Sequence, residues 1–116
     1  MNPTEENLLS WPDFMKVEMR VGTVLTAEPF KEARNPAYKL LVDFGPLGTR
    51  KTSAQITQRY QPADLVGRQV VAVVNFPPKQ IANMQSECLV LGAVGDASGV
   101  TLIQPERPLA NGLRIG

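Results

Sequence analysis

Short stretches of alternating apolar and polar residues dominate the first half of the chain. This period-two alternation is typical of strands that bury one face. It predicts strands over residues 17–27 and 38–44, and a more polar return strand over residues 49–54. Gly22, in the middle of the first strand, predicts a bulge or bend that lets the sheet curl. The side chains expected to point inward are Val17, Met19, Val21, Leu25, Tyr38, Leu40, Val42 and Phe44.

The second half of the chain is organised around one strongly apolar segment. Residues 68–76 contain an unbroken run of valine and alanine, which predicts a central strand covered on both faces. Two prolines end it at residues 77–78, and residues 86–93 and 100–104 predict two further strands around a turn. The proline- and glycine-rich tail from Pro105 still contains apolar residues, so we expect it to dock on this subunit or on another.

Helical signals are confined to two short segments. Ser10 can cap a helix that follows it, and a second short helix is expected between Pro62 and Gly67. We therefore assign residues 1–13 to an N-terminal extension with a short helix. Residues 14–116 are assigned to one folded domain that includes a C-terminal extension.

Together these elements predict an all-β protein. Five or six short strands, a glycine bend in the first and a helical insertion between the third and fourth fit a five-stranded OB-fold barrel with short helical insertions and terminal extensions. Ten prolines and nine glycines in 116 residues argue against a helical bundle. Periodicity alone leaves a small β-sandwich as the alternative.

The composition excludes several kinds of enzyme. Histidine is absent and Cys88 is the only cysteine, which excludes triads built on histidine, histidine metal sites and intrachain disulfides. Cys88 lies in an apolar strand and is expected to be a packed thiol. Residues 50–53 resemble part of a phosphate-binding loop but lack the glycine that must precede the lysine. We expect no catalytic residue, no metal and no cofactor.

The distribution of charge and the hydropathy of the chain indicate which partners and which cell compartment to expect. Residues 1–15 carry a net charge of −3, residues 16–60 carry +4 and residues 61–116 are neutral, so the first half of the folded body is basic. Charge alone favours a solvated surface over a nucleic-acid site. The N-terminus lacks the features of a signal peptide, and no stretch approaches the ~20 apolar residues of a membrane span. We expect a cytoplasmic protein without a membrane span.

Five segments carry a resemblance to a known family. They are residues 17–22, residues 32–40, Ser53-Ala54-Gln55-Ile56, Asn75-Phe76-Pro77-Pro78-Lys79-Gln80-Ile81 and Ser86-Glu87. In order and spacing these segments resemble the tRNA-binding-domain OB-fold family. Residues 53–57 and 73–78 are similar to its CsaA branch, which consists of stand-alone bacterial chaperones linked to protein export. The resemblance covers nearly the whole chain, from about residue 14 to the C-terminus.

The resemblance implies a five-stranded OB barrel, a two-fold homodimer built partly from the terminal extensions, and no catalytic activity. In related members the scaffold binds the outside of the folded tRNA elbow, by shape more than by sequence. The CsaA branch implies binding of unfolded or precursor polypeptides without nucleotide hydrolysis. The expected partners are therefore unfolded or precursor polypeptides, tRNA and a second copy of the chain.

Basic and hydrogen-bonding side chains near the predicted second and third strands are candidates for RNA contact, because OB barrels bind nucleic acid there. The candidate RNA-binding residues are Arg20, Arg34, Lys39, Arg50, Lys51, Ser53, Gln55, Asn75, Lys79 and Ser86. Relatives often read His-Pro-Asn-Ala-Asp-Lys where this chain has residues 34–39, and Lys39 is kept. For Asn75, Glu87 and the two serines, the alternative role is to satisfy nearby backbone groups.

Apolar residues that the strand pattern leaves unexplained are candidates for polypeptide contact. These residues include Phe30 and the tail residues Leu109, Leu113 and Ile115, and the ones that we assign to polypeptide binding are Phe14, Phe76, Ile81 and Met84. The last three flank the two prolines, which hold a loop extended, and methionine adapts to varied partners. For Trp11, Leu109 and Leu113 we favour a role in sealing a dimer interface.

The predicted function is that of an ATP-independent chaperone for unfolded or export-bound polypeptides, with tRNA-binding capacity. The alternative is a tRNA-binding factor that recognises the outside of the folded tRNA through the basic OB face. The sequence leaves open whether the two ligands would use separate or overlapping surfaces.

Overall fold

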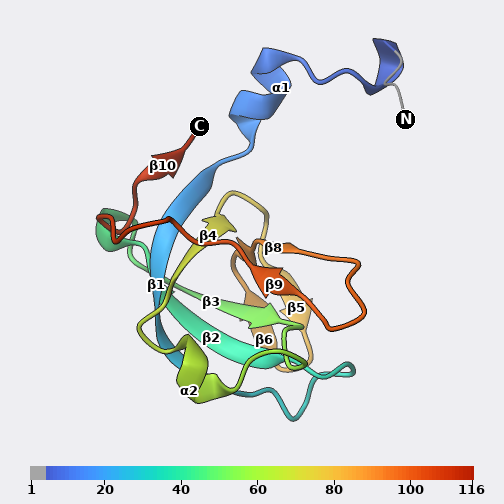
Figure 1. Ribbon diagram of the computed structural model, residues 1–116, viewed down its shortest axis with the longest axis vertical. Helices are drawn as coiled ribbons and strands as arrows, with labels where there is room; N and C mark the ends of the chain where they lie inside the picture. The colour runs from blue at the N-terminus through green and yellow to red at the C-terminus, as the bar shows by residue number, and fades with distance from the viewer. Residues whose placement is uncertain (1–4) are drawn as a thin grey trace.

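The computed structural model describes residues 5–116, and one antiparallel sheet curls within it into a nearly closed barrel (Figure 1). The strand order is β3-β2-β1-β4-β7, and the C-terminal strand β10 pairs with the start of β1. The strands of this sheet are β1 (Met19–Pro29), β2 (Tyr38–Asp43), β3 (Thr49–Ala54), β4 (Gln69–Val73), β7 (Leu89–Val90) and β10 (Arg114–Ile115). The mostly-β barrel confirms the predicted OB-like fold class.

Two small hairpins and four short helices complete the described chain. They are the hairpin of β5 (Lys79–Ile81) with β6 (Met84–Ser86), the hairpin of β8 (Gly92–Ala93) with β9 (Thr101–Leu102), the α-helices α1 (Trp11–Lys16) and α2 (Pro62–Leu65), and the 3-10 helices η1 (Glu5–Asn7) and η2 (Gly45–Leu47). Ser10 caps α1 as predicted, since its Oγ accepts a hydrogen bond of 3.2 Å from the Asp13 N–H. The predicted second helix is also confirmed as α2.

The first strand differs from its prediction in the place of its irregularity. The register between β1 and β2 shifts between Val24 and Thr26, so the bulge lies there and not at Gly22. The prediction that Leu25 points inward is wrong. Leu25 has no partner at the shift and is exposed, because it follows Val24, which lies opposite the buried Val42 and points into the core. Gly22 is instead a point of close approach: a Cβ there would lie 2.6 Å from Cγ1 of Val42. Val17 precedes the strand and is also exposed.

The core follows the alternation of β2 and β4. All four residues predicted to point inward from residues 38–44 are buried, from Tyr38 to Phe44. The last four residues of β4 are buried as well, which confirms a central strand covered on both faces. A second, smaller cluster packs Phe30, Ala37 and Met84 together at the side of the barrel. This cluster fixes the connection between β1 and β2, which forms one wall of the site described below.

Hydrogen bonds from backbone and side-chain groups join β3 to the end of β6 and to Glu87, which follows it. The backbone N–H of Lys51 donates to Oε1 of Glu87 at 2.9 Å, and the Glu87 N–H donates to the Lys51 carbonyl at 2.8 Å. The Ser53 N–H donates to Oγ of Ser86 at 3.2 Å. These contacts satisfy the free edge of β3 and hold the β5–β6 hairpin against it. The sequence did not predict this hairpin, and it placed a single strand over residues 86–93 where β7 and β8 are separate.

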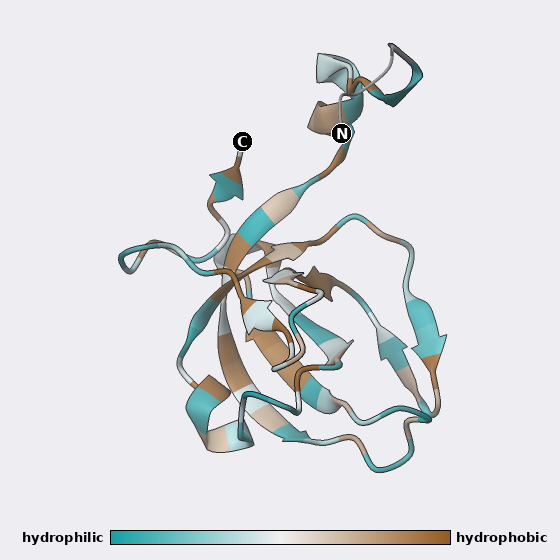
Figure 2. Cartoon of the chain, turned by 45° about the vertical axis from the view of Figure 1, so that its right-hand side comes forward, coloured by the Kyte–Doolittle hydropathy of each residue, from teal (hydrophilic) through white to brown (hydrophobic). Residues whose placement is uncertain are grey.

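The N-terminal segment stands away from the barrel, near the C-terminal strand (Figure 1). Its helix α1 shows apolar colour although it projects from the body (Figure 2). The exposed apolar side chains of this segment are Leu8, Leu9, Trp11 and Met15. Nη2 of Arg114 donates to the Met15 carbonyl at 2.8 Å, which links the segment to β10. The apolar tail thus docks on its own subunit at Ile115, which pairs with Met19, while Leu113 is exposed.

The division of the chain into two parts stays a prediction. The helix α1 continues to Lys16 and therefore crosses the expected boundary between residues 13 and 14. Residues 1–4 of the expected extension lie outside the described residues.

Candidate binding surface

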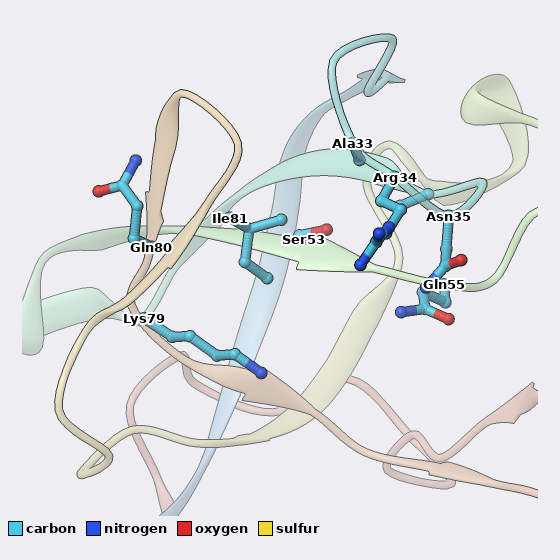
Figure 3. Close-up of a pocket in the computed structure, with 9 residues that line it drawn as sticks. Ala33, Arg34, Asn35, Ser53, Gln55, Lys79, Gln80 and Ile81 are labelled. Atoms are coloured by element: carbon cyan, nitrogen blue, oxygen red, sulfur yellow. The ribbon is translucent and has the colours of Figure 1, made fainter.

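A polar cavity of about 400 Å³ lies where β3, β5 and the connection between β1 and β2 meet. Figure 3 shows the side chains that line it, with Arg34 and Asn35 from the connection, Ser53 and Gln55 from β3 and its end, and Lys79 and Ile81 from β5. The full lining is Ala33, Arg34, Asn35, Ala37, Ser53, Gln55, Lys79, Gln80 and Ile81. We call this site the polar cavity.

The connection between β1 and β2, which carries Arg34, is held at both ends by backbone hydrogen bonds and by buried side chains. The Phe30 N–H donates to the Ala37 carbonyl at 3.0 Å, and the Ala33 N–H donates to the Phe30 carbonyl at 3.2 Å. Phe30 and Ala37 are buried against Met84 of β6, so the two ends of the connection are anchored in the small cluster. The exposed tip between them therefore presents Arg34 from a fixed base.

A second cavity, of about 320 Å³, adjoins the polar cavity along β5 and is mainly apolar. Its lining residues are Ser53, Phe76, Pro77, Lys79, Ile81, Ser86, Cys88 and Leu89. The side chains of Phe76 and Leu89 are 54% and 48% exposed, so large apolar groups remain open to solvent at its rim. The adjacent prolines fix the backbone at that rim, because their φ angles are restricted. We call this site the apolar cavity.

The two cavities form one continuous surface. Ser53, Lys79 and Ile81 line both of them. Lys79 and Ile81 are two residues apart on β5, so they project from the same face of that strand. In the hairpin Lys79 lies opposite Ser86, which itself lines the apolar cavity. The strand β5 is therefore a shared wall between a cationic half and an apolar half.

The cationic half has charges available for an anion. Among residues 5–116 the ion pairs within 4 Å involve Lys16, Arg20 and Lys39, and none involves Arg34 or Lys79. Both side chains lie at the polar cavity and both residues are exposed. A guanidinium and an ammonium at one hollow match the phosphate groups of a nucleic-acid backbone.

Lys39 and Lys51 occupy a neighbouring hollow of about 210 Å³ on the strands β1 to β3. Nζ of Lys39 lies 3.8 Å from Oε2 of Glu32 and 4.8 Å above the centre of the Phe30 ring. Part of its charge is thus neutralised inside the subunit. Lys51 is exposed, and its backbone is held by Glu87. These lysines extend the basic surface beyond the polar cavity without lining it.

Three candidate RNA-binding residues are engaged in contacts with the backbone instead. Nη1 of Arg20 donates to the Gly112 carbonyl at 3.1 Å, and Nη1 of Arg50 donates to the Val74 carbonyl at 2.9 Å. Nδ2 of Asn75 donates to the Lys16 carbonyl at 2.6 Å, and its Oδ1 accepts from the Glu18 N–H at 3.0 Å. Asn75 therefore connects α1 to β1. These side chains hold the fold together, which is the alternative that the sequence offered for Asn75.

Ser86 differs from Ser53 and Gln55 in what its side chain contacts. Oγ of Ser86 accepts from the Ser53 N–H, so this side chain serves the backbone although it also lines the apolar cavity. Ser53 and Gln55 line the polar cavity, and their role in RNA contact stays a prediction. Of the ten RNA candidates, the structure gathers Arg34, Ser53, Gln55 and Lys79 in one place.

Two of the four polypeptide candidates lie together in the structure and two lie elsewhere. Phe76 and Ile81 lie together at the apolar cavity. Met84 is buried with Phe30 and Ala37 and does not line that cavity, although its cross-strand partner Ile81 does. Phe14 belongs to α1 and packs against Trp11, with the ring centres 5.5 Å apart. The structure therefore separates both residues from the surface around Phe76.

Sequence reasoning missed Pro77 and Leu89 as lining residues of the apolar cavity. Cys88 and Val90 point inward in the strand pattern, so the alternation places the apolar Leu89 outward, and that signal could have been used. Cys88 is buried as predicted, and burial raises the pKa of its thiol from 9.0 to about 11. The thiol is therefore protonated at neutral pH and is a poor nucleophile.

Residues 5–116 contain no cluster of three or more histidine, cysteine, aspartate or glutamate side chains that could hold a metal ion. Nor does any helix there have the length and apolar character needed to cross a membrane.

Comparison with known proteins assigns the chain to a family. The family model described as "Putative tRNA binding domain" matches residues 19–114. The methionine–tRNA ligase of Methanococcoides burtonii is 33% identical over 102 residues, which are 88% of this chain. The chain spans only 15% of the length of that ligase.

Solved structures match over almost their whole length. The structure of the chaperone CsaA from Bacillus anthracis str. Ames superposes with a TM-score of 0.89 at 54% identity, covering 94% of this chain and 99% of that one. The structure of the CsaA chaperone protein from Picrophilus torridus gives a TM-score of 0.88 at 45% identity, covering 94% and 100%. With most of its length matched both by the family model and by these two structures, the chain belongs to the tRNA-binding-domain family and, within it, to the CsaA type.

Proposed function

We propose that this protein is an ATP-independent chaperone that holds unfolded or export-bound polypeptide segments in the apolar cavity and also binds tRNA at the polar cavity. The observation that carries the proposal is the continuity of the two cavities across β5, with Phe76 and Leu89 on one side and Arg34 on the other. The similarity to two proteins titled CsaA chaperones supports the first activity. The tRNA-binding family model supports the second.

The apolar cavity suits a side chain of an extended segment. Burying a leucine- or phenylalanine-sized side chain contributes about 1.5–3 kcal/mol, which gives weak and reversible capture at one site. Such weak binding fits a protein that holds a client without hydrolysing a nucleotide. A homodimer would present two such cavities to one chain and strengthen capture through effective concentration. We propose that dimer, with the exposed apolar side chains around Trp11 as part of its interface.

The polar cavity suits the phosphate backbone of a folded RNA. Arg34 and Lys79 can contact phosphates, while Ser53 and Gln55 offer hydrogen bonds to sugars or base edges. Lys51 on the neighbouring strand widens the basic surface toward the expected OB face. A protein that acted only as a tRNA-binding factor would need this half of the surface alone, and the exposed Phe76 would then have no role. We propose that both activities take place in the cytoplasm and involve no catalysis.

The chaperone activity is tested by light scattering of a denatured client, such as citrate synthase, diluted without ATP. We expect the protein to suppress aggregation and Phe76→Ser to lose most of that protection. Val66→Ser is the matched control, because Val66 is 52% exposed, close to the 54% of Phe76, and lies outside the cavity. Equal protection by the two variants would contradict the assignment of the apolar cavity, and absence of protection by the unaltered chain would contradict the chaperone proposal.

A further inference from the structure

One strand separates the two proposed ligands. Lys79 and Ile81 project from the same face of β5, and each lines both the polar and the apolar cavity. Ser53, on the neighbouring strand, is the third residue common to both. In Figure 3 the side chains of Ile81 and Ser53 lie between those of Gln80 and Arg34, and the Lys79 side chain runs below them. A ligand in either cavity therefore meets the same three side chains.

Both ligands would contact the same shared side chains. A phosphate paired with the Lys79 ammonium fixes that side chain, and the alkyl stem of the same residue is part of the wall of the apolar cavity. The size of the RNA adds to this overlap. A folded tRNA is larger than this 116-residue chain, so a tRNA seated at the polar cavity covers the adjoining rim formed by Phe76.

We propose that tRNA and an unfolded polypeptide exclude one another on this surface, so that tRNA releases a held polypeptide. The inference rests on the proposed function and adds a regulation to it. The relation is reciprocal by thermodynamic necessity: each ligand raises the apparent dissociation constant of the other. For full exclusion, tRNA at nine times its own dissociation constant raises that of the polypeptide by about tenfold.

A second cationic hollow provides a control for simple charge effects. It has a volume of about 430 Å³ and lies beside α2 and the C-terminal segment, with Arg68, Glu106 and Arg107 among its lining residues. In both ribbon views α2 and the β5–β6 hairpin lie on opposite sides of the barrel (Figures 1 and 2). Replacing Arg107, which is exposed, therefore removes one positive charge without altering the proposed surface.

The test measures the fluorescence anisotropy of labelled, reduced and carboxymethylated α-lactalbumin, a permanently unfolded chain, titrated with the protein at increasing concentrations of an unlabelled tRNA transcript. We expect the apparent dissociation constant to rise linearly with tRNA and without a plateau. AMP at the same phosphate concentration should leave it unchanged. In Arg34→Gln, displacement should need more tRNA by the same factor by which the direct tRNA dissociation constant rises, whereas Arg107→Gln should behave as the unaltered chain.

The direct titrations separate the possible failures. If the protein binds either ligand alone too weakly to measure, the corresponding part of the proposed function is wrong and the inference falls with it. If both ligands bind alone and the apparent dissociation constant is constant or reaches a plateau as tRNA rises, the two are bound together and only the inference is overturned. A linear rise with AMP as steep as with tRNA would also overturn it, since any phosphate would then displace the polypeptide.

Discussion

The backbone N–H of Ser53 donates a hydrogen bond of 3.2 Å to Oγ of Ser86, and this bond crosses from β3 to the β5–β6 hairpin. Oγ of Ser86 also lies 3.3 Å from Oγ1 of the buried Thr52. The hairpin carries Lys79 and Ile81, so the position of the shared wall depends on this contact. The position of the proposed binding surface therefore rests on this bond together with the two hydrogen bonds between Lys51 and Glu87.

Replacing Ser86 by alanine should lower the stability of the protein. The change leaves the half-buried Ser53 N–H without its acceptor, and the net loss of one such hydrogen bond costs about 0.5–1.5 kcal/mol. Urea denaturation measures the loss as a lower midpoint. Ser53→Ala is the matched control, because it keeps the N–H and the bond to Ser86. Equal midpoints for the two variants would show that this bond does not hold the hairpin.

Binding of tRNA should weaken steeply as salt increases, because phosphate contacts release counterions. Filter binding of a tRNA transcript across a salt series gives the slope of log affinity against log salt. Arg34→Gln and Lys79→Gln should each reduce that slope by roughly 0.7–0.9, the value for one lost phosphate contact. Arg50→Gln should leave the slope unchanged, because that guanidinium is bonded to the Val74 carbonyl. A slope reduced by Arg50→Gln and not by Arg34→Gln would move the RNA site elsewhere.

The stability of the protein should fall in alkaline solution because of Cys88. Burial raises the pKa of its thiol to about 11 in the folded chain, while the thiol of the unfolded chain ionises at its ordinary pKa of 9.0. The stabilising contribution is therefore complete below pH 9 and is lost as pH rises toward 11, by at most about 1.4 kcal/mol per pH unit. The measurement compares the free energy of unfolding of the unaltered chain with that of Cys88→Ala between pH 8 and pH 11. A constant difference would contradict the burial of this thiol.

The proposed dimer should depend on the N-terminal segment. Trp11 is 69% exposed and stands next to Leu8 and Leu9, so a single subunit leaves a connected apolar stretch in water. Sedimentation velocity should show a dimer for the unaltered chain and a shift toward monomer for Trp11→Ser. Val66→Ser, far along the sequence on an exposed site beside α2, serves as the control. A monomer at every concentration of the unaltered chain would contradict the proposal.

The strands of the barrel could be predicted because their alternation directly reports burial. Tyr38 to Phe44 are buried at every second position, as the sequence indicates. Leu25 was wrongly predicted to point inward because the pairing of β1 with β2, which no local pattern encodes, places Val24 opposite the buried Val42 and so leaves Leu25 on the outer face. The β5–β6 hairpin was missed for a related reason: its strands have three residues each, too few for a period to show.

The binding surface could be predicted only in part. Arg34, Ser53, Gln55 and Lys79 meet although they come from three separate elements. The expected binding face of an OB barrel made them candidates, and periodicity alone does not show that they meet. Asn75 has the right residue type for RNA contact but is engaged by the backbone of α1 and β1, which becomes visible only when the fold brings residues 16 and 18 to it. The overlap of the two cavities is likewise a property of the folded hairpin.

The most direct test of the shared surface is to follow the backbone amide chemical shifts of the protein during two separate titrations, one with a tRNA transcript and one with carboxymethylated α-lactalbumin. We expect the amides of Ser53, Lys79 and Ile81 to shift with both ligands, the amide of Arg34 to shift mainly with tRNA, and that of Phe76 to shift mainly with the polypeptide. Two sets of shifts that share none of the residues on β3 and β5, or shifts confined to α1 and β10, would contradict the shared surface.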